Sequence, residues 1–439
     1  MSEVTRRALG WGALYLGLAL LPMGIALLRA PAEGRGLWVE FGAMLGLLAL
    51  GVMALQAVVS GRHRWFAESL GFDNLLQFHR RMGNAALVLV LLHPLVLLTA
   101  RPEWLGYLDP RAEAVRALTL WGLLAGTLLL VVSSLWRGRL GLSYERWRLL
   151  HGLLAFGVVA GGLGHALMVG HYTAGALTVL ALVAAIGLAL VALLESRLLR
   201  PWRLRRRPWR VVEVAPVRGD ATTLALEPVG EHRLDFVPGQ FIWITLGETP
   251  FRLQQHPFSL VSSAERPRRL ALTAKRLGDF TATLPEVPVG TRAFVEGPYG
   301  AFLPDVDNPS GAVLIAGGIG ITPMMSMLRT FADRGERLPL WLIYANPRWE
   351  EATFREELEA LAERLTLTVI HVIDEPPAGW QGESGKLDRD LLARRLPPDD
   401  GRRYYFICGP DPLMNAAEGA LIELGVAPTR IYSDRFDMV

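Results

Sequence analysis

Six apolar stretches of membrane-spanning length lie before residue 200, and they restrict the first half of this chain to a helical membrane fold. The length of each is close to that which an α-helix needs to cross a bilayer, about 20 residues. The stretches are Ala8–Leu28, Leu37–Val59, Asn74–Thr99, Ala117–Trp136, Leu149–Val169 and Tyr172–Leu194. The first is long and lacks a clear small-residue cleavage site, so we expect a retained helix rather than a signal peptide.

Arginine residues are unevenly distributed between the two ends of these stretches. One side carries Arg6, Arg7, Arg62, Arg64, Arg80, Arg81, Arg137, Arg139, Arg146, Arg148 and the basic run 197–210, and the other carries only Arg29, Arg35, Arg101, Arg111 and Arg116. Positive residues are retained on the cytoplasmic side of membrane proteins. We therefore expect an integral protein of the cell membrane with both termini cytoplasmic. The third and fifth spans then run parallel, from inside to outside.

Four histidines occur in the third and fifth spans, in two pairs with the same spacing. His79 and His93 are 14 residues apart, as are His151 and His165. On a helix this separation rises about 21 Å and ends about 40° from a whole number of turns, so each pair shares one face. Parallel helices would bring His79 to His151 near the cytoplasm and His93 to His165 near the far side, as two bis-histidine haems b require.

Two alternatives to haem ligation explain these histidines less well. A single histidine in a span can simply hydrogen-bond a neighbouring helix, but ionisable groups in lipid are costly, and four at a duplicated spacing are hard to explain as packing. Zinc is the main alternative metal. Histidines so far apart along one helix cannot converge on one ion.

The charge pattern argues against a nucleic-acid partner, and the cysteine count excludes an intrachain disulfide. The formal net charge is only +3, and the excess lies beside the membrane. We interpret the run 201–210 as a contact with anionic membrane lipid, or a plain stop-transfer flank, rather than a nucleic-acid site. Cys408 is the only cysteine, which rules out an intrachain disulfide. No acidic loop has EF-hand spacing, so a Ca²⁺-sensing segment is not expected.

After residue 210 the pattern becomes that of a soluble α/β protein. Short β-type runs separated by Pro and Gly predict a small antiparallel barrel. From residue 312, strands alternate with helices, which indicates a parallel sheet with a nucleotide site at the carboxyl ends of its strands. The turn 316–323 leaves a buried strand and opens a helix. Its glycines let the backbone approach a pyrophosphate, although the motif is not the GxGxxG of dinucleotide folds.

Several motifs in this soluble half occur in the order and at the intervals of a known superfamily. They are His256-Pro257-Phe258-Ser259, Lys275-Arg276-Leu277-Gly278-Asp279-Phe280-Thr281, Gly297-Pro298-Tyr299-Gly300, Gly317–Pro323, Cys408-Gly409-Pro410 and Ser433-Asp434-Arg435-Phe436. The segment from about residue 210 resembles the ferredoxin–NADP reductase superfamily. Together with the six-helix half, the whole chain resembles the NADPH oxidase and ferric reductase family of transmembrane flavocytochromes b, of prokaryotic type.

The resemblance implies three domains and a distinct set of cofactor contacts. A six-helix transmembrane di-haem domain is expected over 1–200, an antiparallel β-barrel FAD domain over 201–306 and an α/β parallel-sheet NAD(P)H domain over 307–439. By position in the motifs, His256 faces the FAD phosphates, Phe258 lies against the flavin ring and Ser259 hydrogen-bonds near flavin N5. The short helix opened by Gly278, Asp279, Phe280 and Thr281 holds the FAD pyrophosphate, and the remaining predicted FAD contacts are Pro257 and Lys275.

The same resemblance assigns the nucleotide side of the site. Gly318, Gly320 and Thr322 hold the pyrophosphate of NAD(P)H, and Cys408 lies near the nicotinamide carbon that gives up hydride. Phe436 resembles the C-terminal aromatic that covers the flavin, although three residues follow it here. The predicted nucleotide contacts also include Gly317, Pro323, Arg348, Gly409 and Pro410. With Ser259, the residues Cys408 and Phe436 make up the predicted catalytic set.

These features together imply electron transfer from cytoplasmic NAD(P)H through FAD and two haems b to an acceptor outside. Oxygen reduced to superoxide is the expected outcome, with a ferric or metal-chelate reductase of the same architecture as the alternative. A nucleotide-regulated transporter is a remote alternative. We favour NADPH, because no carboxylate follows the strand LWLIYAN and the guanidinium of Arg348 can pair with a 2′-phosphate. The alternative is a solvated arginine beside Glu350 and Glu351, at the start of a charged helix expected over 350–364. Arg101, Arg116 and His171 are candidates for the edge of the outer haem, with interfacial snorkelling as the alternative for the arginines.

Overall fold

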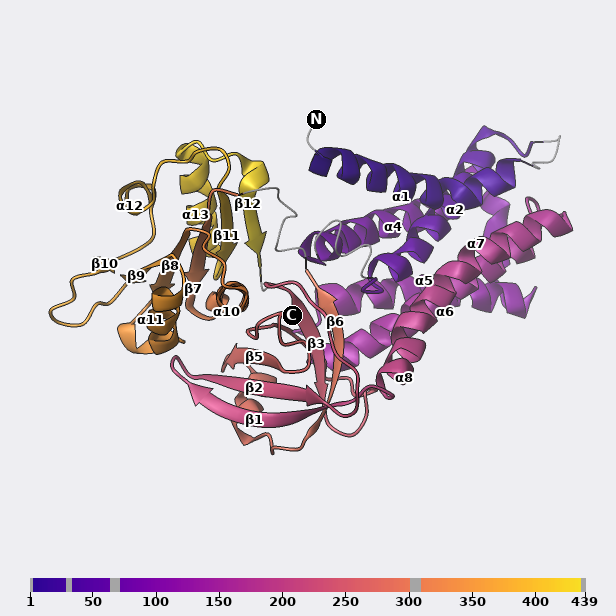
Figure 1. The fold of residues 1–439 in the computed structure, drawn as a ribbon. Helices are drawn as coiled ribbons and strands as arrows, with labels where there is room; N and C mark the ends of the chain where they lie inside the picture. The colour runs from indigo at the N-terminus through magenta and orange to yellow at the C-terminus, as the bar shows by residue number, and fades with distance from the viewer. Residues whose placement is uncertain (1–2, 29–33, 64–71, 301–308, 436–439) are drawn as a thin grey trace. The chain divides into compact units, whose positions relative to one another are not determined.

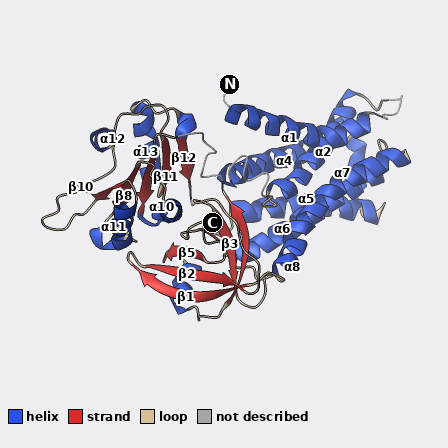
Figure 2. Ribbon diagram, viewed as in Figure 1, coloured by secondary structure: helices blue, strands red, loops and turns tan. Residues whose placement is uncertain are grey.

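The computed structural model describes residues 3–28, 34–63, 72–300 and 309–435. The chain divides into two compact units, Met1–Pro201 and Trp202–Val439. In the described ranges the first unit is helical and the strands belong to the second, as the chain colours of Figure 1 and the element colours of Figure 2 show.

The first unit contains six helices that are long and apolar enough to cross a membrane. They are α1 (Glu3–Leu27), α2 (Leu37–Val59), α4 (Phe72–Ala100), α5 (Ala114–Leu135), α6 (Tyr144–Val169) and α7 (Ala176–Leu194). The short η1 (Pro102–Leu108) lies between α4 and α5, and η2 (Glu195–Leu199) and α8 (Arg200–Leu204) follow α7. Each predicted span corresponds to one of these helices. Large apolar side chains point outwards from them, such as Leu188 at 73 % exposure and Leu118 at 65 %. A lipid-facing surface explains this exposure, and the chain is an integral membrane protein.

The predicted sixth span begins four residues too early. The sequence expectation starts at Tyr172, whereas α7 begins at Ala176. Gly170 ends α6 in the left-handed conformation, with φ 75°, which suits a residue without a side chain. Tyr172 is buried against Ala26 and Leu47, so it packs between helices instead of continuing one.

The second unit begins with an antiparallel barrel. Its six strands are β1 (Trp209–Val217), β2 (Ala221–Pro228), β3 (Phe241–Leu246), β4 (His256–Ser259), β5 (Leu270–Lys275) and β6 (Arg292–Tyr299), in the order β4-β3-β6-β1-β2-β5. A bridge between Leu260 and Leu272 connects the two edges of this sheet. Apolar side chains such as Leu224, Ile242 and Leu272 fill its interior, each with no exposed surface. The short helix α9 (Asp279–Thr283) and η3 (Leu284–Glu286) follow β5.

A parallel sheet forms the rest of the second unit. Its strands are β7 (Ala312–Gly317), β8 (Leu340–Asn346), β9 (Leu367–Ile373), β10 (Glu383–Ser384), β11 (Tyr404–Cys408) and β12 (Ile431–Asp434), in the order β10-β9-β8-β7-β11-β12. Its helices are α10 (Ile321–Arg334), α11 (Arg355–Arg364), α12 (Arg389–Arg395) and α13 (Asp411–Glu423), with the short η4 (Gly318–Gly320), η5 (Trp349–Glu351) and η6 (Pro428–Arg430). Alternate residues of β7 pack in the two separate cores on opposite faces of the sheet. This is the doubly covered arrangement that an all-apolar parallel strand predicts.

The charged helix after β8 begins later than the sequence suggests. A continuous helix is expected over 350–364, but α11 starts at Arg355. Phe354 has a left-handed backbone, with φ 62°. The Thr353 hydroxyl donates to the Arg218 carbonyl of the barrel at 3.0 Å. The segment is therefore used for a contact between barrel and parallel sheet, at the expense of the first helical turn.

Candidate functional site

The two histidine pairs face one another across α4 and α6. The ring centres of His79 and His151 are 6.2 Å apart with planes inclined at 63°, and those of His93 and His165 are 6.2 Å apart at 72°. Both predicted pairs therefore come together. Because each pair joins the corresponding ends of the two helices, α4 and α6 run parallel.

The spacing of these rings fits a metal ion held between them. Two bonds of about 2 Å from imidazole nitrogen to metal, plus the distance from each nitrogen to its ring centre, span about 6 Å. Within the described residues, no group of three or more His, Cys, Asp or Glu side chains is placed to hold a metal ion. Two histidines per site match the axial ligands of haem iron better than the four-ligand set of a structural zinc.

The backbone of α2 holds the ring of His93. Its Nδ1 lies 2.7 Å from the Gly42 carbonyl oxygen, which can only accept, so Nδ1 carries the proton and Nε2 is available as a ligand. A Cβ atom at Gly46 would lie 2.7 Å from Nδ1 of this ring. Glycine at that position is therefore what lets the ring lie against α2.

A side chain of α5 holds the ring of His151. The Ser134 Oγ lies 3.1 Å from His151 Nδ1. The Ser134 hydroxyl also donates to the Leu130 carbonyl at 2.7 Å. Its single proton is used in that bond, so its oxygen accepts from Nδ1–H of His151, and Nε2 is again the free nitrogen.

The predicted outer-edge residues lie in two different surroundings. His171 Nε2 is 3.7 Å from Glu40, which also accepts from the backbone N–H of Arg35 at 3.0 Å. Burial, the largest effect, and the charge of Arg35 both lower the pKa of His171. Arg116 pairs with Glu113 at 2.8 Å. Arg101 pairs with Glu103 at 3.5 Å. Both arginines thus have carboxylate partners near helix ends.

The two predicted flavin motifs meet at the barrel. The ring of His256 on β4 stacks on Phe280 of α9, with centres 3.9 Å apart and planes inclined at 21°. Phe258 also faces Phe280, at 6.1 Å. The Ser259 hydroxyl is buried and has no hydrogen-bond partner within the described residues. A buried hydroxyl without a partner is costly, so its position fits a bound ligand that supplies one.

The turn before α9 presents backbone donors, as the motif predicts. The Thr281 Oγ1 accepts from the N–H groups of Leu277 and Gly278, at 2.9 and 3.0 Å. The first-turn N–H groups of Asp279, Phe280 and Thr281 have no acceptor within a helix that starts at Asp279. These three donors, rather than that of Gly278, are therefore the ones positioned for an anion.

The two nucleotide motifs come together where the strand order reverses. Strands β8 and β9 lie on one side of β7, and β11 lies on the other. Ligands of open parallel sheets bind outside the carboxyl ends of the strands at such a reversal. A Cβ atom at Gly320 would lie 2.3 Å from the Cys408 carbonyl oxygen, and one at Gly317 would lie 2.9 Å from Pro410. Glycine is required because the two turns touch through their backbones.

Two side chains, those of Thr322 and Tyr344, fix the shape of the Gly317–Gly320 turn. Thr322 is buried, and its hydroxyl donates to the Ile319 carbonyl at 3.0 Å, so it braces the turn instead of projecting from it. The Tyr344 hydroxyl donates to the Gly318 carbonyl at 3.1 Å and accepts from the backbone N–H of Thr353, also at 3.1 Å. Pro323 is buried in the first turn of α10. The hydroxyls of Thr322 on α10 and Tyr344 on β8 thus hold the turn in its shape.

Lys275 and Arg348 share one carboxylate. The Lys275 Nζ lies 3.0 Å from Glu351 Oε2, and Arg348 Nη2 lies 2.7 Å from Glu351 Oε1. The Lys275 hydrogen bond is the main cause that holds the pKa of Glu351 below its usual range, with Arg348 adding to it. Neither predicted cofactor contact projects alone into the site, and Arg348 lies against Glu351, as in the alternative to a 2′-phosphate contact.

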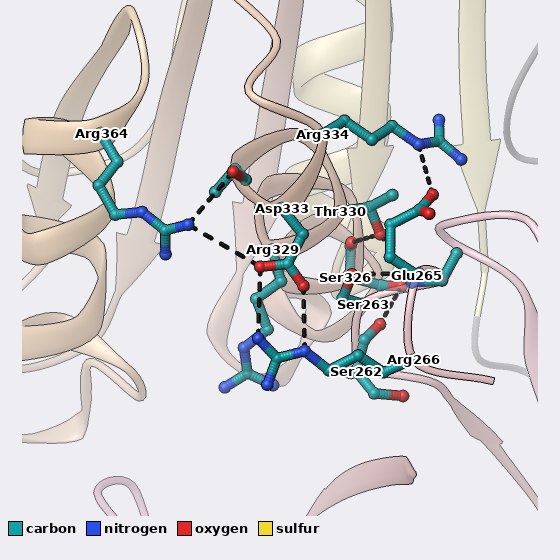
Figure 3. A network of polar contacts seen from close by, with 12 residues as sticks. Ser262, Ser263, Glu265, Arg266, Ser326, Arg329, Thr330, Asp333, Arg334 and Arg364 are labelled. Atoms are coloured by element: carbon teal, nitrogen blue, oxygen red, sulfur yellow. Dashed lines mark hydrogen bonds and ion pairs between the residues drawn. The ribbon is translucent and has the colours of Figure 1, made fainter. Parts of the chain in front are cut away.

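A network of polar contacts attaches α10 to the segment that follows β4 (Figure 3). The Ser326 hydroxyl donates to the Ser262 carbonyl at 2.9 Å, and the backbone N–H of Ala264 donates to the Thr330 hydroxyl at 2.9 Å. Ion pairs surround these two bonds: Arg266–Asp333, Arg334–Glu265 and Arg364–Asp333. Helix α10, which follows the Gly317–Gly320 turn, is therefore fixed to the segment that follows β4.

Sequence patterns gave no signal for three residues that hold this site together, Gly42, Ser134 and Tyr344. The histidine spacing located the facing rings, but their partners lie on helices whose packing the sequence does not reveal. Phe436, the predicted flavin cover, lies outside the described residues.

Three family descriptions match successive parts of the chain. Residues 45–162 match "Ferric reductase like transmembrane component", residues 209–302 match "FAD-binding domain", and residues 314–419 match "Oxidoreductase NAD-binding domain". The first covers most of α2 to α6, the second covers the barrel, and the third runs from β7 into α13.

Characterised relatives share about half of the chain. The glycine betaine monooxygenase reductase subunit of Chromohalobacter salexigens is 30 % identical over 246 residues, which are 54 % of this chain and 65 % of the relative. The NADH-cytochrome b5 reductase 1 of Pyricularia oryzae is 31 % identical over 188 residues, which are 42 % of this chain and 61 % of the relative. The matches thus span less than two thirds of these relatives.

Two solved structures illustrate the matches found, both with TM-scores below 0.5. The FAD/NAD-binding domain of a nitric oxide dioxygenase from Vibrio cholerae has a TM-score of 0.47 and 26 % identity, over 52 % of this chain and 98 % of that domain. A flavohemoglobin from Malassezia yamatoensis has a TM-score of 0.48 and 20 % identity, over 92 % of this chain and all of that one.

Proposed function

Since the chain has the three-part architecture of the ferric reductase and NADPH oxidase family, we propose that it carries electrons across a membrane, from NAD(P)H through FAD and two haems b to an acceptor on the far side. That three-part architecture is that of a transmembrane oxidoreductase of ferric reductase type that depends on FAD and NAD.

The observation that carries the proposal is the pair of facing histidines at each end of α4 and α6. Both ring separations of 6.2 Å match one iron between two axial imidazoles. His79 and His151 would hold the inner haem, and His93 and His165 the outer one. With a rise of about 21 Å along each helix, the two irons would lie on a path through the bilayer.

The second unit provides the input side. Bound FAD would accept a hydride and pass electrons on singly, and haem iron carries one electron at a time. The Ser259 hydroxyl would hydrogen-bond the flavin, and the His256 ring, which stacks on Phe280, would face its phosphates. The first-turn N–H groups of α9 would hold the FAD pyrophosphate, and the Gly317–Gly320 turn that of NAD(P)H. Cys408 would lie beside the nicotinamide, and Phe436 over the flavin.

Dioxygen, giving superoxide, is the acceptor that we propose. A ferric chelate is the second candidate, favoured by the ferric reductase match over 45–162. Two axial histidines leave no open position on the iron, so either acceptor would react at the haem edge. The candidates for the edge of the outer haem are His171, Arg101 and Arg116, each of which lies near a carboxylate.

The second unit would lie in the cytoplasm. The arginine-rich helix ends support this, because by the positive-inside rule both termini would be on that side of the cell membrane. The basic segment 201–210 would then lie against anionic lipid. The corresponding domain limits are 1–200 for the haem domain, 201–306 for the FAD domain and 307–439 for the NAD(P)H domain.

Anaerobic stopped-flow spectroscopy of the full chain, loaded with FAD and haem, tests this sequence of transfers. Mixing with NADPH should reduce the flavin first and both haems afterwards. Subsequent mixing with O₂ or a ferric chelate should reoxidise them, and the faster of the two identifies the acceptor. Superoxide dismutase should suppress detection of the product only if O₂ is reduced by one electron. Flavin reduction with no haem reduction would contradict the proposal.

A further inference from the structure

The two haem-ligand helices have different supports for their histidines. His93 donates to a backbone carbonyl of α2, that of Gly42, at 2.7 Å. His151 donates to a side chain of α5, the hydroxyl of Ser134, at 3.1 Å. Every residue has a backbone carbonyl, so substitution of Gly42 would keep this acceptor. The hydroxyl is lost when Ser134 is replaced by alanine, so the support of His151 depends on Ser134 itself.

The bond to Leu130 makes the Ser134 hydroxyl an acceptor for His151. In a helix the serine hydroxyl can rotate between several partners. Here it donates to the Leu130 carbonyl one turn earlier, at 2.7 Å. This bond fixes the oxygen lone pairs towards α6. The Nδ1–H of His151 then has a defined acceptor, and the ring is held with Nε2 towards His79.

Trp147 limits the rotation of the same ring. Its ring lies one turn before His151 on α6, with ring centres 5.2 Å apart and planes inclined at 44°. The imidazole is thus in contact with an aromatic ring of its own helix and hydrogen-bonded to α5. Two independent contacts define its orientation.

We propose that Ser134 is a positioning residue that sets the orientation and the electron donation of His151, and so lowers the reduction potential of the inner haem specifically. The inference rests on the bis-histidine function proposed above. A hydrogen bond donated by the non-ligating nitrogen raises the basicity of the ligating one. A more basic ligand stabilises ferric over ferrous iron, so the potential falls.

The consequence is a built-in difference between the two haems. His93 of the outer pair has the shorter bond, to a backbone carbonyl that substitution cannot remove. His151 of the inner pair has the longer bond, to a hydroxyl that also donates to Leu130. Substitution at Ser134 should therefore shift one haem and leave the other unchanged.

Ser133 provides a matched control on the adjacent position. Its hydroxyl donates to the same Leu130 carbonyl, at 3.2 Å, and its side chain is 1 % exposed. In the part of the chain that the structure describes, no hydrogen bond joins Ser133 to His151. Ser133→Ala removes a buried helix hydroxyl of the same kind without touching the ligand. Ser134→Thr keeps a hydroxyl that can make the same bond one turn back.

The test is spectroelectrochemical titration of both haems in the full chain, together with the low-temperature electron paramagnetic resonance of the ferric state. Ser134→Ala should raise one midpoint potential and change one of two low-spin signals. Ser133→Ala should change neither, and Ser134→Thr should restore the wild-type values. Loss of one haem in Ser134→Ala alone would also support a role in holding His151.

Two results would overturn the inference. One is a Ser134→Ala protein with both potentials and both signals unchanged. The other is an equal shift in Ser133→Ala, which would show a general effect of packing in α5. Either outcome leaves the haem proposal standing if the wild type binds two haems. A wild type without haem would instead remove the proposed function, and this inference with it.

Discussion

Replacing Tyr344 with Phe removes one hydroxyl that supports the nucleotide turn. In the wild type this hydroxyl donates to Gly318 and accepts from Thr353, both at 3.1 Å. Burial raises the pKa of Tyr344 to about 12, so the hydroxyl remains a donor throughout the physiological range. Thr353 continues the connection, because its own hydroxyl donates to Arg218 of the barrel at 3.0 Å.

The two lost bonds have different costs. The Thr353 residue is 3 % exposed, so its N–H group would be left buried without a partner, at a cost of about 1–3 kcal/mol to folding. Gly318 is only partly buried, so water can replace part of its lost bond. A net loss of about 1 kcal/mol at the turn corresponds to about fivefold weaker nucleotide binding.

Stopped-flow flavin reduction at varied NADPH and NADH measures both effects separately. Tyr344→Phe should raise the nucleotide concentration at half-saturation about fivefold for both nucleotides, with the limiting rate little changed. Tyr405→Phe is the control. Its hydroxyl donates to Asp399 at 3.1 Å, away from the turn, and Asp399 keeps its pair with Arg430. Equal half-saturation in Tyr344→Phe and wild type, or an equal rise in Tyr405→Phe, would refute the reasoning.

Three further predictions concern the second unit. Burial lowers the pKa of His371 from 6.5 to about 4. The unfolded chain therefore binds the extra proton at a higher pH than the folded chain, and the free energy of unfolding should fall by up to about 3 kcal/mol as the pH drops from about 6.5 to 4. The temperature at which FAD is released should fall over the same pH range, and His371→Gln should weaken this pH dependence. Arg348→Ala should lower kcat/KM for NADPH selectively, by about 1.5–3 kcal/mol for a charged hydrogen bond, and Glu351→Gln should raise it, because the competing carboxylate is removed; equal effects on NADH would exclude both residues from the 2′-phosphate site. Ser259→Ala should slow flavin reduction more than it weakens FAD binding, whereas His256→Ala should weaken FAD retention; FAD titration and stopped-flow traces that show the reverse would reassign the two side chains.

Much of the fold could be predicted from the sequence, because the relevant patterns are local. Span length, charge asymmetry and the alternation of strands with helices depend on neighbouring residues. The histidine spacing also predicts which rings should meet, since helix geometry converts 14 residues into a fixed rise and angle. The structure places His79 against His151 and His93 against His165, as that spacing requires.

The supports of the site could not be predicted, because they depend on packing between distant segments. Ser134 contacts His151 only because α5 lies beside α6, and nothing distinguishes it in sequence from Ser133. The late start of α11 has a similar origin, since Thr353 contacts the barrel. For Arg348 the sequence left two partners open, a 2′-phosphate and the nearby carboxylates, and the structure shows the pair with Glu351.

Haem quantification in the wild type and in four single variants tests the central claim most directly. The full chain should bind two haems b, with the reduced absorption of low-spin, bis-histidine iron. His79→Ala and His151→Ala should each lose the same haem, and His93→Ala and His165→Ala should each lose the other, which gives two matched pairs of spectra. A wild type without haem, or four variants that all retain two haems per chain, would contradict the account.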